Sequence, residues 1–313
     1  MTTEVRAPDL TAHILRVLAA NDPAVGVRTA IDPPGSGVGF WAGGPSAVYA
    51  QGVFWLAYRL RRPVDEGRGF ANVLARSSDG VHFETVTTVS SDEFGAASLE
   101  RPALVPLDSG GFRLYVSCST WHSKHWWVEA LEVDADGQVE GRKMVLPGDE
   151  ATTAWKDVVV HRNGQQWQMW ACQHPLSDGD DEADRMSTWY ATSDDGWEWD
   201  WNGAALAPSP GRWDARGTRV ASVLQTADGW LAFYDGRASV YENWHERTGV
   251  AFGTGPDAFT ALGEPTPVGQ TARYLSLAEL PDGYRLYWEA SRVDGAHDLR
   301  TAYVPRPESL TQS

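Results

Sequence analysis

The sequence predicts an all-β protein, a five-bladed β-propeller with a short N-terminal helical extension. Two observations lead to this prediction. The 313 residues include 16 Trp, 31 Gly and 18 Pro, and such a mixture of large aromatic and turn-forming residues is typical of short strands joined by tight turns. From Trp41 onward the chain also repeats one pattern roughly every fifty to sixty residues, a period typical of propeller blades.

Residues 1–40 are expected to form an extension before the repeats, and residues 41–313 the propeller. Within the extension, residues 11–20 have apolar side chains at helical spacing, and Asp9 or Thr11 can cap the first turn. One short helix is therefore expected before the β-rich part of the chain. The apolar residues at this spacing are Ile14, Leu15, Val17 and Leu18.

The repeats share one order of elements. Each begins with a short apolar strand, followed by a Gly-containing turn, an aromatic-rich strand, a polar loop, a third strand and often a fourth. A single unit cannot bury both faces of its sheet, whereas units stacked in a ring can. The five first strands are expected at residues 44–49, 100–105, 156–160, 218–223 and 274–277.

Charge and targeting signals exclude several classes of partner. The formal net charge of −16 argues against nucleic acid, because a surface that follows phosphates needs an excess of Lys and Arg. No secretory signal and no apolar run of membrane-spanning length is recognisable, so a cytoplasmic protein without a membrane partner is expected. Cys118 and Cys172 occupy equivalent places in neighbouring strand patterns and are expected in the core rather than in a disulfide.

The polar residues are expected to gather on one face. Strands in a blade alternate in direction, so the start of each first strand and the loop between the second and third strands lie at the same end of the ring. The starts contribute Glu100 and Arg101, Lys156 and Asp157, and Arg219. The loops contribute an acidic stretch at 178–184 and the residues Trp121, His122, His125, Trp126, His174, Asp235, Arg237, Glu242, Trp244, Glu246, Arg247 and Glu289.

This mixture of side chains suits a sugar. Indole rings stack on the C–H face of a sugar ring, while Asp and Arg side chains bond its hydroxyl groups. Glycoside cleavage needs a carboxylic acid to protonate the leaving oxygen and a second carboxylate. The catalytic candidates are Asp157 and Glu100, on rigid first strands, followed by Asp235 and Glu289. Substrate-binding candidates are Arg101, Lys156, Trp121, His122, His125, His174, Arg219, Arg237, Glu242, Trp244, Glu246 and Arg247.

A structural role is the alternative for the charged residues. Charged side chains at the start of otherwise apolar strands are costly unless they are paired or used. A ring of ion pairs that holds the blades together would also explain Glu100, Asp157 and Arg219.

The acid-led first strands Glu100-Arg101-Pro102 and Trp155-Lys156-Asp157-Val158, with the five repeats and aromatic second strands, resemble a known superfamily. It comprises the five-bladed propeller glycosidases, with arabinan- and xylan-trimming furanosidases, invertase-like enzymes and mannoside phosphorylases. The resemblance covers nearly all the chain after Trp41 and implies glycoside cleavage. In the furanosidase branch a base Asp stands on the first strand of the first blade and a second Asp lies deeper, and Asp157 matches the deeper one.

The first blade departs from that pattern, because Gly43-Gly44-Pro45-Ser46 carries no acid. This opening and the Lys156-Asp157 pair look more like the phosphorylase branch. The expected function is therefore glycoside hydrolysis of a small-molecule or oligosaccharide substrate, with phosphorolysis as the alternative. A sugar-binding or scaffold propeller without catalysis is the competing hypothesis, because propellers host many functions.

No cofactor is expected. The chain has no zinc-spaced His and Cys cluster, phosphate loop or nucleotide-binding glycine motif. His122 and His125 are three residues apart in a loop and form a weak candidate metal pair. A structural ion on the propeller axis remains open.

Overall fold

The computed structural model describes residues 7–20, 24, 26–176, 185–265 and 272–306. The acidic stretch at 178–184 lies outside the described residues. Apart from the helix α1 (Ala7–Ala20) and short 3-10 turns, the elements are strands, so the prediction of an all-β fold with one N-terminal helix is confirmed. No helix in the described part of the chain is long and apolar enough to cross a membrane.

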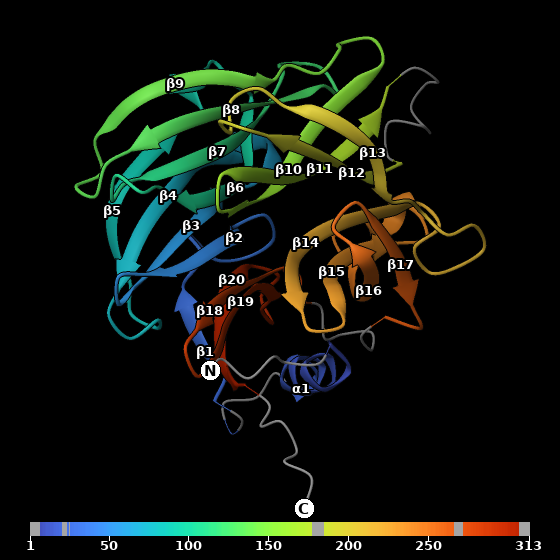
Figure 1. Ribbon diagram of the computed structural model, residues 1–313. Helices are drawn as coiled ribbons and strands as arrows, with labels where there is room; N and C mark the ends of the chain where they lie inside the picture. The colour runs from blue at the N-terminus through green and yellow to red at the C-terminus, as the bar shows by residue number, and fades with distance from the viewer. Residues whose placement is uncertain (1–6, 21–23, 25, 177–184, 266–271, 307–313) are drawn as a thin grey trace, which may run out of the picture.

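Three of the sheets have four antiparallel strands each, in chain order (Figure 1). The first comprises β6 (Ser98–Pro106), β7 (Phe112–Ser119), β8 (Trp126–Val133) and β9 (Val139–Leu146). The second comprises β10 (Thr153–Asn163), β11 (Gln166–Pro175), β12 (Ser187–Ser193) and β13 (Asp200–Leu206). The third comprises β14 (Gly217–Thr226), β15 (Gly229–Arg237), β16 (Arg247–Gly255) and β17 (Ala258–Leu262).

An eight-stranded sheet contains the remaining strands as two antiparallel runs. One run is β2 (Trp41–Ala50), β3 (Val53–Arg61), β4 (Gly69–Ser77) and β5 (Glu84–Ser90). The other is β18 (Arg273–Leu280), β19 (Gly283–Ser291), β20 (His297–Pro305) and β1 (Arg28–Ile31). A single parallel pair, Trp41 with His297, joins the two runs.

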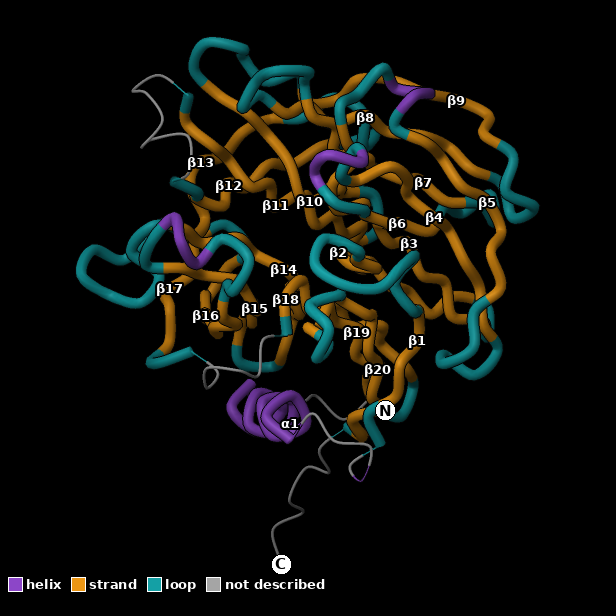
Figure 2. The backbone as a smooth tube through the Cα atoms, turned by 180° about the vertical axis from the view of Figure 1, so that it is seen from behind, coloured by secondary structure: helices purple, strands orange, loops and turns teal. Residues whose placement is uncertain are grey.

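The first strands of the runs surround a common axis. β2, β6, β10, β14 and β18 contact one another in that order, and β18 contacts β2. Figure 1 and, from behind, Figure 2 show these strands at the centre and the later strands of each run further out. The starts of the five strands therefore converge at one end of the axis.

The N-terminal segment contributes to both core and sheet. In α1 the residues Ala7, Leu10, Ile14 and Leu18 are buried, and the helix contacts β15 and β20. The predicted helix thus exists and begins at Ala7 rather than near residue 11. Residues 28–31, expected in the extension, pair with β20 and form a strand of the last run.

The apolar core lies between neighbouring sheets. One cluster, for example, joins Tyr115 and Val128 of the β6–β9 sheet to Trp167 and Met169 of the β10–β13 sheet. Cys118 and Cys172 are both free and buried, which confirms their expected place in the core.

Every first strand has an irregularity near its start. The pairing register with the second strand shifts there, for example between Lys156 and Val159 and between Arg273 and Ser276. Asp157 and Tyr274 have positive φ values of 52° and 55°, and Gly44 has 58°. A β-bulge redirects side chains. At two of these bulges the redirected side chains, Asp157 and Arg273, contact charged partners from other strands.

Candidate functional site

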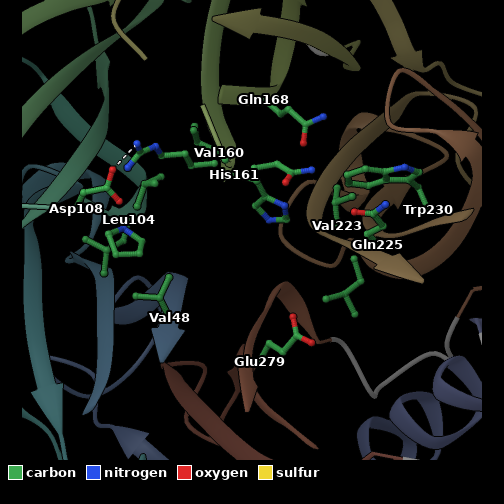
Figure 3. A pocket seen from close by; sticks show the side chains of 16 residues that line it. Val48, Leu104, Asp108, Val160, His161, Gln168, Val223, Gln225, Trp230 and Glu279 are labelled. Atoms are coloured by element: carbon green, nitrogen blue, oxygen red, sulfur yellow. Dashed lines mark hydrogen bonds and ion pairs between the residues drawn. The ribbon is translucent and has the colours of Figure 1, made fainter. Parts of the chain in front are cut away.

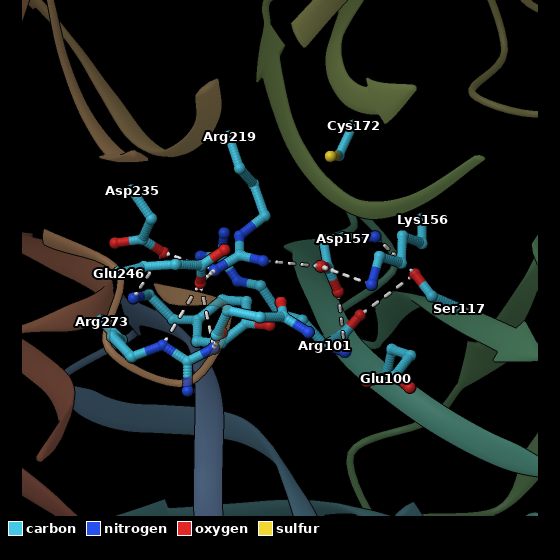
Figure 4. A network of polar contacts seen from close by, with 12 residues as sticks. Glu100, Arg101, Ser117, Lys156, Asp157, Cys172, Arg219, Asp235, Glu246 and Arg273 are labelled. Atoms are coloured by element: carbon cyan, nitrogen blue, oxygen red, sulfur yellow. Dashed lines mark hydrogen bonds and ion pairs between the residues drawn. The ribbon is translucent and has the colours of Figure 1, made fainter. Parts of the chain in front are cut away.

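Charged side chains fill the end of the axis where the first strands begin (Figure 4). Strand register places Arg219 of β14 opposite Asp235 of β15, and Arg273 of β18 opposite Glu289 of β19. The same register places Arg59 of β3 opposite Gly43. We call the following set the axial network: Arg59, Glu100, Asp157, Arg219, Asp235, Arg237, Glu246, Arg273 and Glu289.

Arg219 contacts three carboxylates of this network. Its Nη1 lies 3.4 Å from Oδ2 of Asp157, its Nη2 donates a hydrogen bond of 2.9 Å to Oδ2 of Asp235, and Nη2 also donates to Glu246. Figure 4 shows the guanidinium between Asp157 on one side and the other two acids on the other. One cation therefore links carboxylates from β10, β15 and the segment just before β16.

Two further arginines complete this side. Oε2 of Glu246 accepts a 3.0 Å hydrogen bond from Arg273, and its Oε1 accepts one of 3.2 Å from Arg237. Arg273 also donates to Oε1 of Glu289 at 2.7 Å, and Nδ1 of His297 lies 2.8 Å from the same oxygen. Both glutamates are fully buried and have several cationic partners.

Glu100 is surrounded by cations from the other side of the axis. It pairs with Arg59, and Nη2 of Arg68 lies 3.4 Å from its Oε1. Lys156 is close enough to affect the pKa of Glu100, and its Nζ lies 4.4 Å from the centre of the Trp126 ring. The Lys156 ammonium is also 3.9 Å from Oδ2 of Asp157.

The glycines of the first strand make room for two of these side chains. A Cβ at Gly43 would lie 1.8 Å from Oε2 of Glu289, and a Cβ at Gly44 would lie 3.1 Å from Cβ of Arg101. The position that lacks an acid in the sequence is therefore occupied by the carboxylate of Glu289, which comes from β19.

The pKa values of the carboxyl groups are shifted in different directions. Burial alone would raise the pKa of Glu100 and Glu246, but the neighbouring arginines outweigh it and lower both to about 2. Burial is likewise outweighed at Glu289, where Arg273 and His297 hold the pKa well below its usual range. At Asp235 burial prevails, and Glu246 adds to it, so the pKa is raised although Arg219 opposes the shift. Asp235 is thus the one among these four whose pKa is raised rather than lowered.

Tyr274 lies at the centre of the cations. Its ring is 4.0 Å from the Arg219 guanidinium carbon, and Arg273, Arg59 and Arg101 lie 5.2, 5.8 and 5.9 Å from the ring centre. Its backbone N–H donates to Oδ2 of Asp235 at 3.0 Å. Cations over an aromatic face are attracted by its quadrupole, so this ring helps to hold four arginines together.

An aromatic group borders the network. Arg61 lies 3.9 Å from the centre of the Trp41 ring and 5.5 Å from that of Trp244. Trp41 stacks on His297 at 4.3 Å. Trp244 is 42% exposed, so it presents an indole to solvent next to a buried guanidinium.

The structure brings many of the predicted residues together. The four catalytic candidates, with Arg219, Arg237 and Glu246, belong to the axial network. Trp244 borders it, and the ring of His174 lies 5.2 Å from that of Trp126. Arg101 reaches the axis, but its guanidinium donates to the carbonyl oxygens of Pro45 and Ala221.

Other predicted residues lie outside the network. Trp121 and His122 are exposed, and Nε1 of Trp121 donates to the Gly95 carbonyl. Arg247 lies against the Trp213 ring, and Glu242 accepts a hydrogen bond from the backbone of Ala238 within its own loop.

The two histidines of the candidate metal pair, His122 and His125, have different surroundings. The ring nitrogens of His125 lie 2.8 Å from Oγ1 of Thr120 and 3.0 Å from the Pro147 carbonyl oxygen, whereas His122 is exposed. Among the residues that the structure describes, no group of three or more His, Cys, Asp or Glu could hold a metal ion.

Several network residues were not predicted from sequence. Arg59 and Arg61 end the second strand β3 and alternate with apolar residues, which places both on one face. Asp235 and Arg237 stand at the same places in β15, so comparison of the repeats would have indicated the arginines. The other residues missed in or beside the network are Trp41, Arg68, Arg273 and Tyr274.

The fold of this chain is similar to that of solved carbohydrate-active proteins. The chain superimposes on a β-1,2-mannobiose phosphorylase from Listeria innocua with a TM-score of 0.62 and 15% identity, over 88% of this chain and 94% of that one. For a thermostable family-43 glycoside hydrolase the TM-score is 0.63 and the identity 11%, over 91% of this chain and 99% of that one. For a glycosyl hydrolase from Bacteroides ovatus the TM-score is 0.58 and the identity 17%, over 88% of this chain and 89% of that one.

These likenesses establish the fold. No protein-family model and no curated protein sequence matches the chain. The resemblance to the propeller glycosidases drawn from the sequence is confirmed at the level of the fold.

Proposed function

We propose that this protein is a five-bladed propeller that cleaves a glycosidic bond with the carboxyl groups of the axial network. Each antiparallel run of four strands is counted as one blade, so the eight-stranded sheet contributes two. The similarity in fold to glycoside hydrolases and mannoside phosphorylases supports this class of reaction.

The proposal depends above all on two buried carboxyl groups that contact the same arginine, one of which has a raised pKa. Asp235, whose pKa is raised, is the proton donor to the leaving oxygen. Asp157 is its partner, because Arg219, Lys156 and the backbone N–H of Arg101 all direct positive charge at its carboxylate. Two carboxyl groups with separate roles are what glycoside cleavage requires.

In the proposed reaction the Asp235 proton moves to the glycosidic oxygen as the bond from that oxygen to the anomeric carbon breaks. In hydrolysis, water adds to this carbon and gives a proton to Asp157. The leaving sugar departs with the proton from Asp235, and the two carboxyl groups then exchange protons with solvent.

Substrate access requires a movement. Asp157, Asp235, Glu246 and Glu289 have no exposed surface. Residues 238–245 cover this side: Asn243 accepts hydrogen bonds from Arg237 and, through its carbonyl oxygen, from Arg273. We propose that displacement of this loop admits the sugar and that Trp244 stacks on it.

Phosphorolysis is the second candidate, and the charge of the site favours it. Seven basic side chains face five carboxylates at this end of the axis, an excess of two positive charges in a chain of net charge −16. A phosphate acceptor would balance this excess. The basic residues are Arg59, Arg61, Arg68, Lys156, Arg219, Arg237 and Arg273, and the acids are Glu100, Asp157, Asp235, Glu246 and Glu289.

The test is release of free sugar or sugar phosphate from a panel of furanosides and pyranosides, with and without phosphate. We expect Asp235→Asn and Asp157→Asn each to lower turnover by about 10²–10⁴-fold. Asp214→Asn is the matched control, because Asp214 is also fully buried but bonds Tyr234 outside the network. Its turnover should remain near that of the native protein.

The phosphate requirement distinguishes the two reactions. Sugar phosphate formed only with added phosphate would identify a phosphorylase, and free sugar without it a hydrolase. No cleavage by the native protein, or equal turnover in all three variants, would overturn the proposal and favour a sugar-binding propeller whose network is structural.

A further inference from the structure

A channel continues along the axis beyond Arg101, away from the axial network. A cavity of about 280 Å³ is lined by all five first strands and by Arg101 at its inner end. It shares Val48, Leu104, His161 and Glu279 with a second cavity of about 550 Å³ near the other ends of these strands. Figure 3 shows the second cavity with His161 and Gln168 directed into it.

The inner end of this channel contains an unused positive donor. Arg101 is 2% exposed. Its Nε and Nη2 donate to the carbonyl oxygen of Pro45, and Nη2 also to that of Ala221. Its Nη1 is buried without a hydrogen-bond partner. A buried donor left unsatisfied is costly, so a ligand or water is expected at this atom.

Three serine hydroxyls line the same cavity. Oγ of Ser222 is buried without a partner. Oγ of Ser46 accepts a hydrogen bond from the backbone of Leu104, and Oγ of Ser276 accepts one from that of Ala47. Because those oxygens already accept, their O–H groups are left to donate. Four donors from β2, β6, β14 and β18 thus border one space.

Charge distinguishes an anion from water as the occupant. Arg101 makes no ion pair within the described part of the chain, and burial lowers its pKa to about 10 although Asp157 and Asp235 partly oppose this. Water would satisfy Nη1, whereas an anion would also balance the charge of a guanidinium that has no ion-pair partner. Burial also lowers the pKa of His161 to about 4, so His161 is neutral at pH 7. Glu279 is the other charged residue lining the smaller cavity, and it is exposed.

We propose that the inner end of the axial channel binds a monovalent anion through Nη1 of Arg101 and the hydroxyl groups of Ser46, Ser222 and Ser276. A single cation without an ion-pair partner matches one negative charge, and four donors that border one cavity match a halide or a carboxylate. This site lies beyond the proposed active site and does not depend on the proposed function.

Two sources could supply such an anion. A halide would fill only the inner end. The carboxylate of a small organic molecule would place its apolar part along Val48, Leu104, Val160 and Val223, which line both cavities. The unpartnered Oε1 of Gln168, in the wider cavity, could accept a hydrogen bond from a longer molecule.

Chloride is the probe in the first experiment. The excess ³⁵Cl NMR line width of a chloride solution is measured with the full-length protein, in chloride titrations at constant ionic strength. We expect saturable broadening with the native protein. For Ser222→Ala we expect the chloride affinity to be about tenfold lower, because one donor to a buried anion is lost. Ser187→Ala is the matched control: Ser187 is a partly buried serine of β12 outside the channel, and it should bind chloride like the native protein.

Competition identifies the source. Acetate and butyrate are added at equal concentration to the chloride-loaded protein. Stronger displacement of chloride by butyrate than by acetate would indicate that the site binds a carboxylate whose apolar chain follows the channel. Equal displacement by the two would indicate that the site binds only a small anion. The proposal is overturned if the native protein gives no saturable broadening, or if Ser222→Ala and Ser187→Ala titrate alike while both remain folded by circular dichroism.

Discussion

The two ends of the same five strands bury different kinds of side chain. At their starts, charged side chains such as Asp157 and Arg219 are buried together and are linked by hydrogen bonds and ion pairs. Further along, the strands line a channel with apolar side chains such as Val160 and Val223 and with serine hydroxyl groups. The bulge between these regions marks the change.

The comparison indicates that the charges of the network depend on one another. Removing one ion leaves its partners buried and uncompensated, which costs more than the pair contributes. In the channel, by contrast, the donors have no such partners, so substitutions there should change binding more than folding. The following predictions test this difference, from the largest expected effect to the smallest.

Arg219→Met should destabilise the protein most. Asp157, Asp235 and Glu246 would lose a shared cation, and we expect the free energy of unfolding to fall by about 3–5 kcal/mol. Urea unfolding at pH 7 measures this. Arg212→Met is the control, because Arg212 is exposed. A loss of less than about 1 kcal/mol, as for a surface ion pair, would show that the network is not mutually dependent.

Gly43→Ala should have the next largest effect. Its Cβ would lie 1.8 Å from Oε2 of Glu289, and the carboxylate cannot retreat without breaking its bonds to Arg273 or His297. We expect a loss of roughly 1–3 kcal/mol by urea unfolding. Gly141→Ala, where a Cβ would meet no atom within 4 Å, should be close to neutral; equal losses in the two variants would contradict the packing argument.

The two ends should lose stability in different pH ranges. The lowered pKa of His161 contributes stability that is full above about pH 6.5 and falls as the pH drops toward 4. For Glu100 and Glu246 the contribution is full above about 4.5 and is lost toward pH 2. His161→Gln should therefore flatten the stability profile between pH 6.5 and 4 in urea unfolding. His122→Gln, at an exposed position, should leave the profile unchanged, and identical profiles for both variants would refute the difference.

Trp244→Ala should affect stability least, by less than about 1 kcal/mol, because the indole is 42% exposed. Once a cleaved substrate is known, its KM should rise about tenfold because a stacking surface is lost. Trp121→Ala removes an exposed indole outside the network and should leave KM unchanged. A similar increase in KM for both variants would show that the effect is not specific to Trp244 and would contradict stacking of the substrate on it.

The sequence predicted those parts of the site that follow from strand order. Glu100, Asp157 and Arg219 were found because a charge at the start of an apolar strand is conspicuous, and alternating strand direction placed them at one end. Gly43 appeared only as a missing acid. That Glu289 fills its space depends on packing between two runs joined by the pair Trp41 and His297, which no local pattern contains.

Loop residues were predicted less well for a physical reason. Position in a polar loop does not determine where a side chain points, so Trp121 and His122 were grouped with Trp244 although they lie elsewhere. Tyr274 was missed because a tyrosine in an apolar strand suggests ordinary packing. Its positive φ of 55° and its four guanidinium neighbours become evident only in three dimensions.

The pairing of β1 with β20 has a consequence for the order of folding. Thr29 donates a hydrogen bond to Asp298, 269 residues later. During synthesis, residues 28–31 emerge early but have no partner until almost the whole chain has been made. Contacts so distant in sequence carry a large loop-closure cost and form slowly. The earliest strand to be synthesised should therefore be among the last to gain protection from hydrogen exchange as the protein folds.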